Sequence, residues 1–333
     1  MRKYIKVNPT YIEVKVSENI TEWESTRPKE YWEYRKKWYE YPRKQIVDNF
    51  PLHLDLESTR RCNLHCPMCP RTIKLERGEK IEEGDMDFKI FKKIVDEGSE
   101  NGLYAIKLSY LGEPLLCKDI IKMIKYTKEK NIIDIMFNTN GALLTEEISR
   151  KLIEAGLDKL FISFDSPFKE KYNKIRIGTN FDTVFNNVKR FIEIRKELGS
   201  STPIVRVSMV VMKENKCDVL NYIKLWKDVV DLIGFSYYVN PQGMDKKNRS
   251  VIKPKIYKNF VCSQLYQRLF VHWNGKIGLC CVDYDGELNL GNVRENSIEE
   301  VWLGEKIQSM RKKHNEGRWK EVRLCKKCHL PYI

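Results

Sequence analysis

Hydrophobic and polar positions follow two alternating periods along most of the chain. Short apolar runs are separated by longer stretches in which apolar residues recur every three or four positions, as Phe88, Phe91, Ile94 and Val95 do. The short runs predict strands over 52–57, 104–110, 132–138, 159–165, 204–211 and 232–238. The longer stretches predict helices over 87–98, 118–130, 145–155, 181–198 and 216–229. The alternation therefore predicts six β/α units in series, with strands that form a parallel sheet.

Six β/α units in series indicate an α/β fold over residues 51–240 whose sheet can curl into a TIM-like barrel or into part of one, such as a partial (β/α)6 barrel. Ligands of such folds bind at the carboxyl ends of the strands. Side chains that directly follow the predicted strands are therefore the first candidates for a functional site.

Two segments lie outside this alternation. Residues 1–50 form an aromatic-rich extension, in which the stretch from Pro28 to Tyr41 predicts a helix that ends before Pro42. We expect its aromatic side chains to pack on the barrel. The polar stretch 240–250 predicts a loop, and residues 241–333 are expected to form a C-terminal domain rich in cysteine.

Composition adds little that is specific. The N-terminus lacks an apolar stretch of signal-peptide length and no run of about 20 apolar residues occurs, so a cytoplasmic protein without a membrane partner is expected. The net charge of +14 would suit an anionic partner. No basic block or groove-reading motif accompanies the charge, so we expect a solvated outer face and no nucleic acid. The lysines concerned are Lys89, Lys92, Lys93, Lys122, Lys125, Lys128 and Lys130.

The ten cysteines carry the clearest chemical signal. Clustered thiols in a reducing compartment indicate metal binding in preference to disulfides. Cys117 and Cys217 stand alone and are expected to be small buried residues. The other eight form two groups, one of Cys62, Cys66 and Cys69, the other of Cys262, Cys280, Cys281, Cys325 and Cys328.

The first group, Cys62-x3-Cys66-x2-Cys69, directly follows the first predicted strand. Three thiolates can hold three corners of a four-iron cluster and leave the fourth iron open to a small molecule. A zinc site would need His65, between two of the thiols, as its fourth ligand, which is an awkward geometry. The spacing and position resemble the motif of the radical SAM superfamily. That resemblance implies a [4Fe–4S] cluster and S-adenosylmethionine.

Residues at the ends of the next two strands resemble the same family. Gly112-Glu113-Pro114 is similar to the element that receives the methionine amino group. Asn138-Thr139-Asn140-Gly141 is similar to a turn that lies near the ribose, which implies roles for Asn138 and Asn140.

Further residues extend the resemblance. Ser163 and Asp165 follow the fourth strand, where relatives place groups near the ribose and the substrate. Arg176 resembles an arginine that neutralises the methionine carboxylate. Met68 stands where relatives often carry an aromatic residue, and its thioether can still pack on adenine. The implied chemistry is reductive cleavage of S-adenosylmethionine to a 5′-deoxyadenosyl radical that takes hydrogen from a substrate C–H bond.

The second cysteine group offers either a zinc site or another iron–sulfur cluster. The stretch from Trp273 to Cys280, with Cys325-x2-Cys328, resembles the SPASM domain or its shorter "twitch" form. A full SPASM domain has seven cysteines, and this segment has five. The resemblance implies one auxiliary [4Fe–4S] cluster held by Cys262, Cys280, Cys325 and Cys328. Cys281 is then a buried residue, a substitute ligand or a hydrogen donor.

The combination looks most similar to enzymes of the 2-deoxy-scyllo-inosamine dehydrogenase type. It implies an oxidoreductase that oxidises an alcohol of a sugar or cyclitol, with the auxiliary cluster as electron acceptor. The substrate would be a small molecule, with an anionic phosphorylated or nucleotide-linked carbohydrate favoured by the charge. Flavodoxin or ferredoxin is the expected electron donor.

Other functions stay open on sequence alone. A carbohydrate epimerase would need a thiol to return hydrogen, for which Cys117, Cys217 and Cys281 are the candidates. A peptide maturase is a further alternative, although the first 50 residues look too short for a leader-binding domain. A zinc-binding module that recognises nucleic acid is the non-enzymatic alternative.

Overall fold

One sheet of eleven strands organises the part of the chain that the computed structural model describes, which is residues 4–8, 11–252 and 260–328. The strand order is β1-β2-β8-β7-β6-β5-β4-β3-β9-β10-β11. The strands are β1 (Tyr4–Asn8), β2 (Tyr11–Lys15), β3 (His53–Leu56), β4 (Ala105–Lys107), β5 (Asp134–Thr139), β6 (Lys159–Ser163), β7 (Ile204–Val211), β8 (Leu232–Tyr237), β9 (Arg268–Val271), β10 (Lys276–Gly278) and β11 (Gly291–Asn292).

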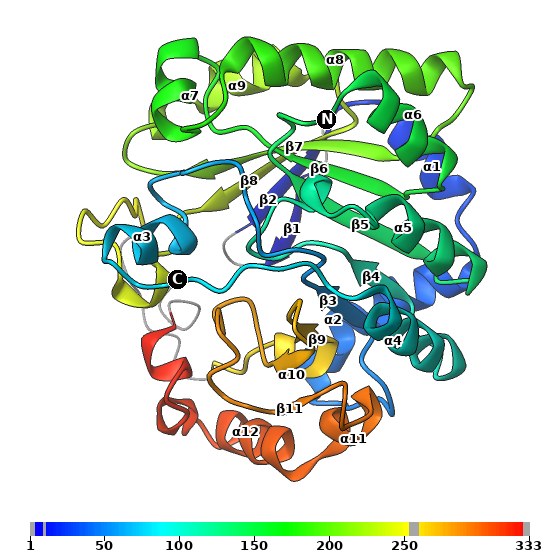
Figure 1. Ribbon diagram of the computed structural model, residues 1–333, viewed down its shortest axis with the longest axis vertical. Helices are drawn as coiled ribbons and strands as arrows, with labels where there is room; N and C mark the ends of the chain where they lie inside the picture. The colour runs from blue at the N-terminus through cyan, green and yellow to red at the C-terminus, as the bar shows by residue number, and fades with distance from the viewer. Residues whose placement is uncertain (1–3, 9–10, 253–259, 329–333) are drawn as a thin grey trace.

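The six predicted strands are β3 to β8, which pair in parallel and in chain order. Helices cover the outside of this curved sheet (Figure 1). The predicted α/β class and partial barrel are therefore confirmed. The helices are α1 (Asn19–Ser25), α2 (Lys29–Lys44), α3 (Pro70–Glu76), α4 (Phe88–Glu100), α5 (Ile120–Glu129), α6 (Glu146–Glu154), α7 (Lys169–Ile175), α8 (Phe181–Glu197), α9 (Val219–Trp226), α10 (Gln264–Gln267), α11 (Ile298–Leu303) and α12 (Glu305–Asn315).

Both segments that lie outside the β/α alternation join the edges of this sheet. Strand β2 pairs antiparallel with β8, and β9 pairs in parallel with β3. The C-terminal segment, orange to red in Figure 1, therefore continues the sheet directly beyond β3, the first strand of the barrel. This pairing brings residues after 260 next to the loop that carries the first cysteine group.

Helix α2 packs its aromatic side chains against the barrel, as expected. Tyr31 and Tyr34 are buried with residues from the first positions of several strands, among them Ala105 and Ile204. Trp32 is the exception and is 46% exposed.

The helix also continues through Pro42 to Lys44, so the prediction that it ends before Pro42 is wrong. A proline inside a helix has no N–H to bond to the carbonyl four residues earlier, which is that of Trp38. Here the Trp38 carbonyl accepts a hydrogen bond of 2.6 Å from the Gln267 side chain. A contact from the distant α10 thus satisfies the acceptor that Pro42 leaves free.

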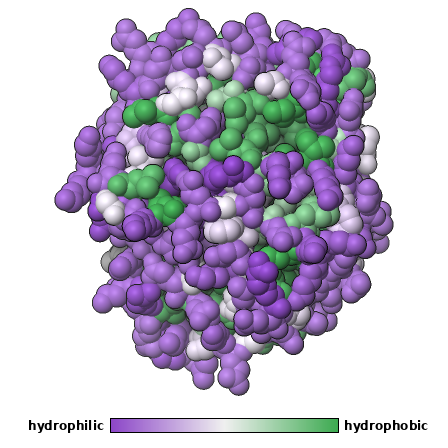
Figure 2. All heavy atoms as spheres, in the orientation of Figure 1, coloured by the Kyte–Doolittle hydropathy of each residue, from purple (hydrophilic) through white to green (hydrophobic). Residues whose placement is uncertain are grey.

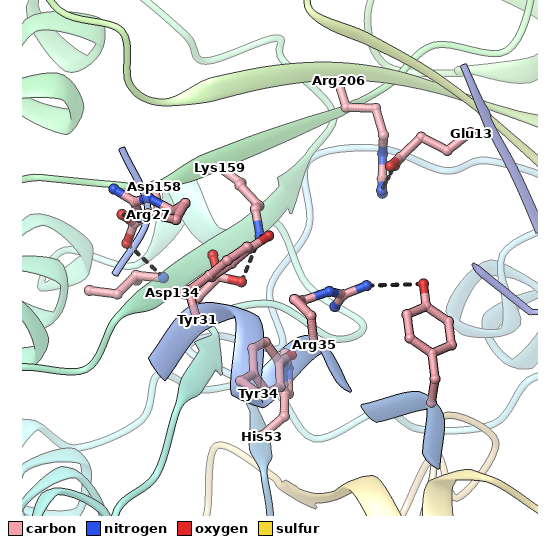
Figure 3. Close-up of polar contacts among 12 residues, drawn as sticks. Glu13, Arg27, Tyr31, Tyr34, Arg35, His53, Asp134, Asp158, Lys159 and Arg206 are labelled. Atoms are coloured by element: carbon pink, nitrogen blue, oxygen red, sulfur yellow. Dashed lines mark hydrogen bonds and ion pairs between the residues drawn. The ribbon is translucent and has the colours of Figure 1, made fainter. Parts of the chain in front are cut away.

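A polar layer lies between α2 and the amino-terminal ends of the barrel strands (Figure 3). Lys159 of β6 donates to Asp134 of β5 at 2.6 Å and to the Tyr31 hydroxyl at 3.3 Å. The Tyr34 hydroxyl lies 3.3 Å from Nδ1 of His53, at the start of β3. These contacts fix α2 across the end of the barrel opposite the cysteine loops.

His53 makes the stability of this end depend on pH. Burial disfavours the imidazolium and lowers the pKa of His53 from 6.5 to about 4. Between pH 6.5 and pH 4 the His53 imidazole is protonated in the unfolded chain but neutral in the folded protein. The free energy of unfolding therefore falls as the pH drops through this range. Groups that contribute charge near the ring are Asp55, Lys107, Asp134 and Arg268.

We expect the free energy of unfolding in urea to fall more between pH 7 and pH 4.5 in the wild type than in His53→Gln. The extra loss in the wild type should be up to about 3 kcal/mol, because each pKa unit is worth about 1.36 kcal/mol. Equal losses in both proteins would show that His53 is not the group concerned.

The face of the molecule seen in Figure 2 is mainly hydrophilic, with a hydrophobic area in the upper half of the view. Five of the seven lysines named above are exposed and two are half-buried, as expected for a solvated face. No helix in the described ranges is both long and apolar enough to cross a membrane.

Candidate active site

The first cysteine group lines a cavity of about 550 Å³. The cysteines lie in the loop between β3 and α3, and the rest of the wall comes mainly from loops after the other barrel strands. Nearly all the residues expected to contact S-adenosylmethionine share this wall: Met68, Gly112, Glu113, Asn138, Asn140, Ser163 and Arg176.

Contacts from two other loops hold the cysteine loop in place. The Asn140 side chain donates to Oδ1 of Asn63 at 2.8 Å, and the His65 amide donates to the Ile177 carbonyl at 2.8 Å. Within the loop the Cys69 amide donates to the Cys66 carbonyl at 2.9 Å. The three thiols therefore reach the cavity from a loop fixed to the ends of β5 and α7.

Gly112 and Glu113 join the next loop to the residues just before Cys62. A Cβ on Gly112 would lie 2.1 Å from the Thr59 carbonyl oxygen, so only glycine allows this approach. The buried carboxylate of Glu113 accepts from the Thr139 hydroxyl at 2.6 Å and from the Asn140 amide at 2.7 Å. Burial raises the pKa of Glu113, and these hydrogen bonds oppose the rise.

We expect Glu113→Gln to destabilise the protein by about 1–3 kcal/mol. An amide offers one acceptor oxygen where the carboxylate offers two, so one buried donor loses its partner. Urea unfolding of the metal-free protein measures the effect. Glu154→Gln, on the exposed face of α6, should change stability by less than about 0.5 kcal/mol. Equal effects of the two substitutions would contradict this role of Glu113.

Arg176 connects the wall of the cavity to Cys66. Its guanidinium forms an ion pair with Asp165 at 2.5 Å and donates to Sγ of Cys66 at 3.7 Å. Asp165 is fully buried behind it and also accepts from the Val210 amide at 2.7 Å. Asp165 therefore holds Arg176 and does not line the cavity itself, and Pro114 likewise lies outside the lining.

Sequence reasoning missed several residues of the wall. They are Arg71, Tyr110, Tyr237, Tyr238 and Tyr284. Tyr237 and Tyr238 stand at the end of the sixth strand, so the rule that ligands bind at strand ends could have found them. Tyr284 comes from the C-terminal segment, and no motif marks it.

The second cysteine group surrounds a second cavity. All five of its cysteines line it, together with apolar Phe260, Leu265 and Leu279 and with His314. The cysteines come from three separate segments: the stretch before α10, the turn after β10 and the turn after α12. Sulfur ligands in an apolar enclosure are suited to an iron–sulfur cluster.

The two cavities share part of their walls. Cys281 lines both, and Tyr284, three residues later, lines the first. Arg60, just before the first cysteine loop, donates to the Tyr284 carbonyl at 2.9 Å and to Asp285 at 2.6 Å. Lys74 of α3 forms an ion pair with the same Asp285. The loops that carry the two cysteine groups are therefore fastened to each other.

Burial determines the protonation state of the cysteine thiols. It raises the pKa of Cys62 to about 11 and that of Cys262 to about 11, so both thiols are protonated at neutral pH until a metal replaces the proton. Cys117 is buried in the core as expected. Cys217 is exposed in a short turn before α9, which corrects the expectation that it is buried.

Comparison with known proteins decides the family. Residues 56–225, just over half of the chain, match the radical SAM superfamily. The chain belongs to the radical SAM superfamily. Residues 262–329 match SPASM, an iron–sulfur cluster-binding domain. This radical SAM protein therefore uses a [4Fe–4S] cluster and S-adenosylmethionine, and its SPASM domain implies auxiliary iron–sulfur binding.

Among curated relatives, a tungsten-containing aldehyde ferredoxin oxidoreductase cofactor-modifying protein of Pyrococcus furiosus is 33% identical over 165 residues. That match covers 49% of this chain and 44% of the relative. A probable GTP 3′,8-cyclase of Methanocaldococcus jannaschii is 29% identical over 219 residues, which is 62% of this chain and 70% of that protein. The radical SAM chain thus spans less than half the length of the Pyrococcus protein.

Solved structures share the fold at low identity. BtrN, in complex with AdoMet and 2-DOIA, has a TM-score of 0.58 and 21% identity, over 85% of this chain and 94% of BtrN. SuiB of Streptococcus suis, bound to precursor peptide SuiA, has a TM-score of 0.63 and 15% identity, over 83% of this chain and 70% of SuiB. These likenesses support the radical SAM fold and leave the substrate open.

Proposed function

We propose that this radical SAM enzyme oxidises a secondary alcohol of a small sugar, aminosugar or cyclitol to a ketone. Cys62, Cys66 and Cys69 would ligate the [4Fe–4S] cluster that binds S-adenosylmethionine. A single auxiliary [4Fe–4S] cluster would be held by Cys262, Cys280, Cys325 and Cys328. The observation that carries the proposal is the wall that the two cysteine-lined cavities share at Cys281.

When bound, the first cluster and S-adenosylmethionine supply a 5′-deoxyadenosyl radical. The protein's part is to bind, orient and shield the reactants. Glu113 and the Asn140 turn would face the methionine amino group and the ribose, and Arg176 the methionine carboxylate. Met68, on the same wall and 8% exposed, would pack on the adenine. Reduction of this site would come from flavodoxin or ferredoxin.

Oxidation of the alcohol removes a hydrogen atom, a proton and an electron. The hydrogen atom on the carbinol carbon would be taken by the 5′-deoxyadenosyl radical, and the hydroxyl proton would pass to a basic group or to water. As the C=O bond forms, the remaining electron would need an acceptor, which an auxiliary cluster held by Cys262, Cys280, Cys325 and Cys328 would supply. Because the two cavities adjoin, a substrate in the first cavity would lie next to that acceptor.

Polar groups on the cavity wall favour a substrate rich in oxygen. The Tyr110 hydroxyl is buried without a hydrogen-bond partner among the described residues. Nε and Nη1 of Arg71 are likewise unpartnered in that part of the chain, although the guanidinium forms an ion pair with Glu83. Buried donors without partners are costly unless a ligand satisfies them, and hydroxyl or phosphate oxygens would do so.

Product analysis tests this function. The reconstituted enzyme is incubated without oxygen with S-adenosylmethionine, a reductant and a panel of cyclitols, aminosugars and sugar phosphates. We expect one member to yield a ketone two hydrogens lighter than the substrate. A product of unchanged mass, or a modified peptide in a parallel incubation with peptides, would overturn the proposal that the enzyme oxidises an alcohol.

Epimerisation is the second candidate, because Cys281 lines the same cavity. Cys117 and Cys217 do not line it, so Cys281 is the candidate hydrogen donor among the three. An epimerase would incorporate solvent deuterium at the carbon that was attacked, and Cys281→Ala would block that incorporation. A ketone product formed equally by the wild type and Cys281→Ala would exclude this role.

A further inference from the structure

His314 joins two of the cysteines that are proposed to hold the auxiliary cluster. The buried imidazole lies near the end of α12, on the wall of the second cavity. Its Nδ1 accepts a hydrogen bond of 3.4 Å from the Cys262 amide, and its Nε2 lies 3.4 Å from Sγ of Cys325. One side chain thus contacts the cysteine before α10 and the cysteine after α12.

The first contact determines the direction of the second. Because Nδ1 accepts the amide hydrogen, it carries no proton, and the proton of the neutral ring is on Nε2. The Nε2–H group is therefore a donor directed at the Cys325 sulfur. When Cys325 is a thiolate ligand, this contact is an N–H···S hydrogen bond to the cluster.

The helix that carries His314 is firmly attached around this site. Arg311, one turn earlier, donates to the carbonyls of Leu265 and Trp302, each at 2.8 Å. Asn315, the next residue, accepts from the Tyr266 hydroxyl at 2.7 Å. These bonds tie α12 to α10 and α11, so the helix that carries His314 is held in place by contacts that do not involve the cysteines.

We propose that His314 is a positioning residue that raises the reduction potential of the auxiliary cluster by donating a hydrogen bond to the Cys325 thiolate. The proposal rests on the ligand set given under the proposed function. A hydrogen bond to a ligand sulfur withdraws electron density and stabilises the reduced cluster, which carries one more negative charge. A higher potential makes the cluster a better acceptor for the electron of a substrate radical.

The test is an EPR-monitored redox titration of the auxiliary cluster in the full chain with Cys62, Cys66 and Cys69 replaced by alanine. The variants are His314→Phe, which removes the donor, His314→Gln, which keeps an N–H donor, and Asn315→Ala. Asn315→Ala removes a neighbouring bond of α12 that reaches no sulfur. No substrate is present, so the result does not depend on which reaction the enzyme catalyses.

We expect His314→Phe to hold its cluster and to titrate at a more negative potential. An approximately tenfold smaller constant for one-electron reduction corresponds to about 59 mV. His314→Gln should shift less, and Asn315→Ala should match the parent protein. An unchanged potential in His314→Phe, or an equal shift in Asn315→Ala, would overturn the proposal.

Iron and sulfide contents keep the other outcomes interpretable. If His314→Phe loses its cluster, a near-parental potential in His314→Gln supports the donor role. Loss of the cluster from both variants makes His314 a ligand or a structural residue and overturns the proposal. A parent protein without any auxiliary cluster would instead refute the proposed ligand set.

Discussion

Replacing Cys66 with alanine is expected to abolish cleavage of S-adenosylmethionine and to remove about four irons per chain. Cys66 is buried and lies beside Arg176, at the centre of the loop that lines the first cavity. Two remaining thiolates cannot hold three corners of a four-iron cluster. Since loss of a residue that only supports a metal ligand costs about 10–100-fold, loss of the ligand itself should cost more than about 100-fold.

Iron analysis and chromatographic detection of 5′-deoxyadenosine measure these two effects. Cys217→Ala is the matched control, because Cys217 is exposed and lines neither cysteine cavity. The control should keep the wild-type iron content and the wild-type rate. A Cys66→Ala variant that still forms 5′-deoxyadenosine at the wild-type rate would contradict the assignment of the first cluster.

Replacing Cys262 with alanine is expected to uncouple cleavage of S-adenosylmethionine from formation of the oxidised product. The variant should lose about four irons and still cleave S-adenosylmethionine, because the first cavity keeps its three thiols. Product formation should fall by more than about 100-fold, because the substrate radical has lost its electron acceptor. The ratio of product to 5′-deoxyadenosine, measured on the same samples, reports this uncoupling.

The adjacent cysteines provide a finer comparison. Cys280→Ala should behave as Cys262→Ala does, whereas Cys281→Ala should keep its auxiliary cluster. Cys281 accepts a hydrogen bond of 3.3 Å from the Gln264 side chain and lines both cavities. Cys280 lines the second cavity and not the first. Loss of the iron from Cys281→Ala with retention in Cys280→Ala would reverse the ligand assignment.

Much of the barrel could be predicted because its signal is local. Strands β5 to β8 each lie within two residues of the expected range, since buried apolar runs and amphipathic helices alternate without interruption. The first cysteine group and the glycine of the Gly112-Glu113 element are equally local. The cysteine spacing and the Gly112-Glu113-Pro114 motif each stand in a few consecutive residues, although the contact of Gly112 with the distant Thr59 carbonyl appears only in the fold.

The missing parts depend on contacts between distant segments. Strand β9 has four residues, and nothing in that length shows that it pairs with β3. Pro42 does not end α2 because Gln267 satisfies the carbonyl that the proline leaves free. The same holds for Tyr284 and His314, which no motif marks and which reach their sites only through the pairing of β9 and the anchoring of α12.

The most direct test of the proposed reaction follows a single hydrogen. A substrate selected by the product analysis is prepared with deuterium on its carbinol carbon and incubated without oxygen with the reconstituted enzyme, reductant and S-adenosylmethionine. Our account predicts one deuterium in the 5′-deoxyadenosine for each ketone formed. Ketone formation with 5′-deoxyadenosine that carries no deuterium would contradict it.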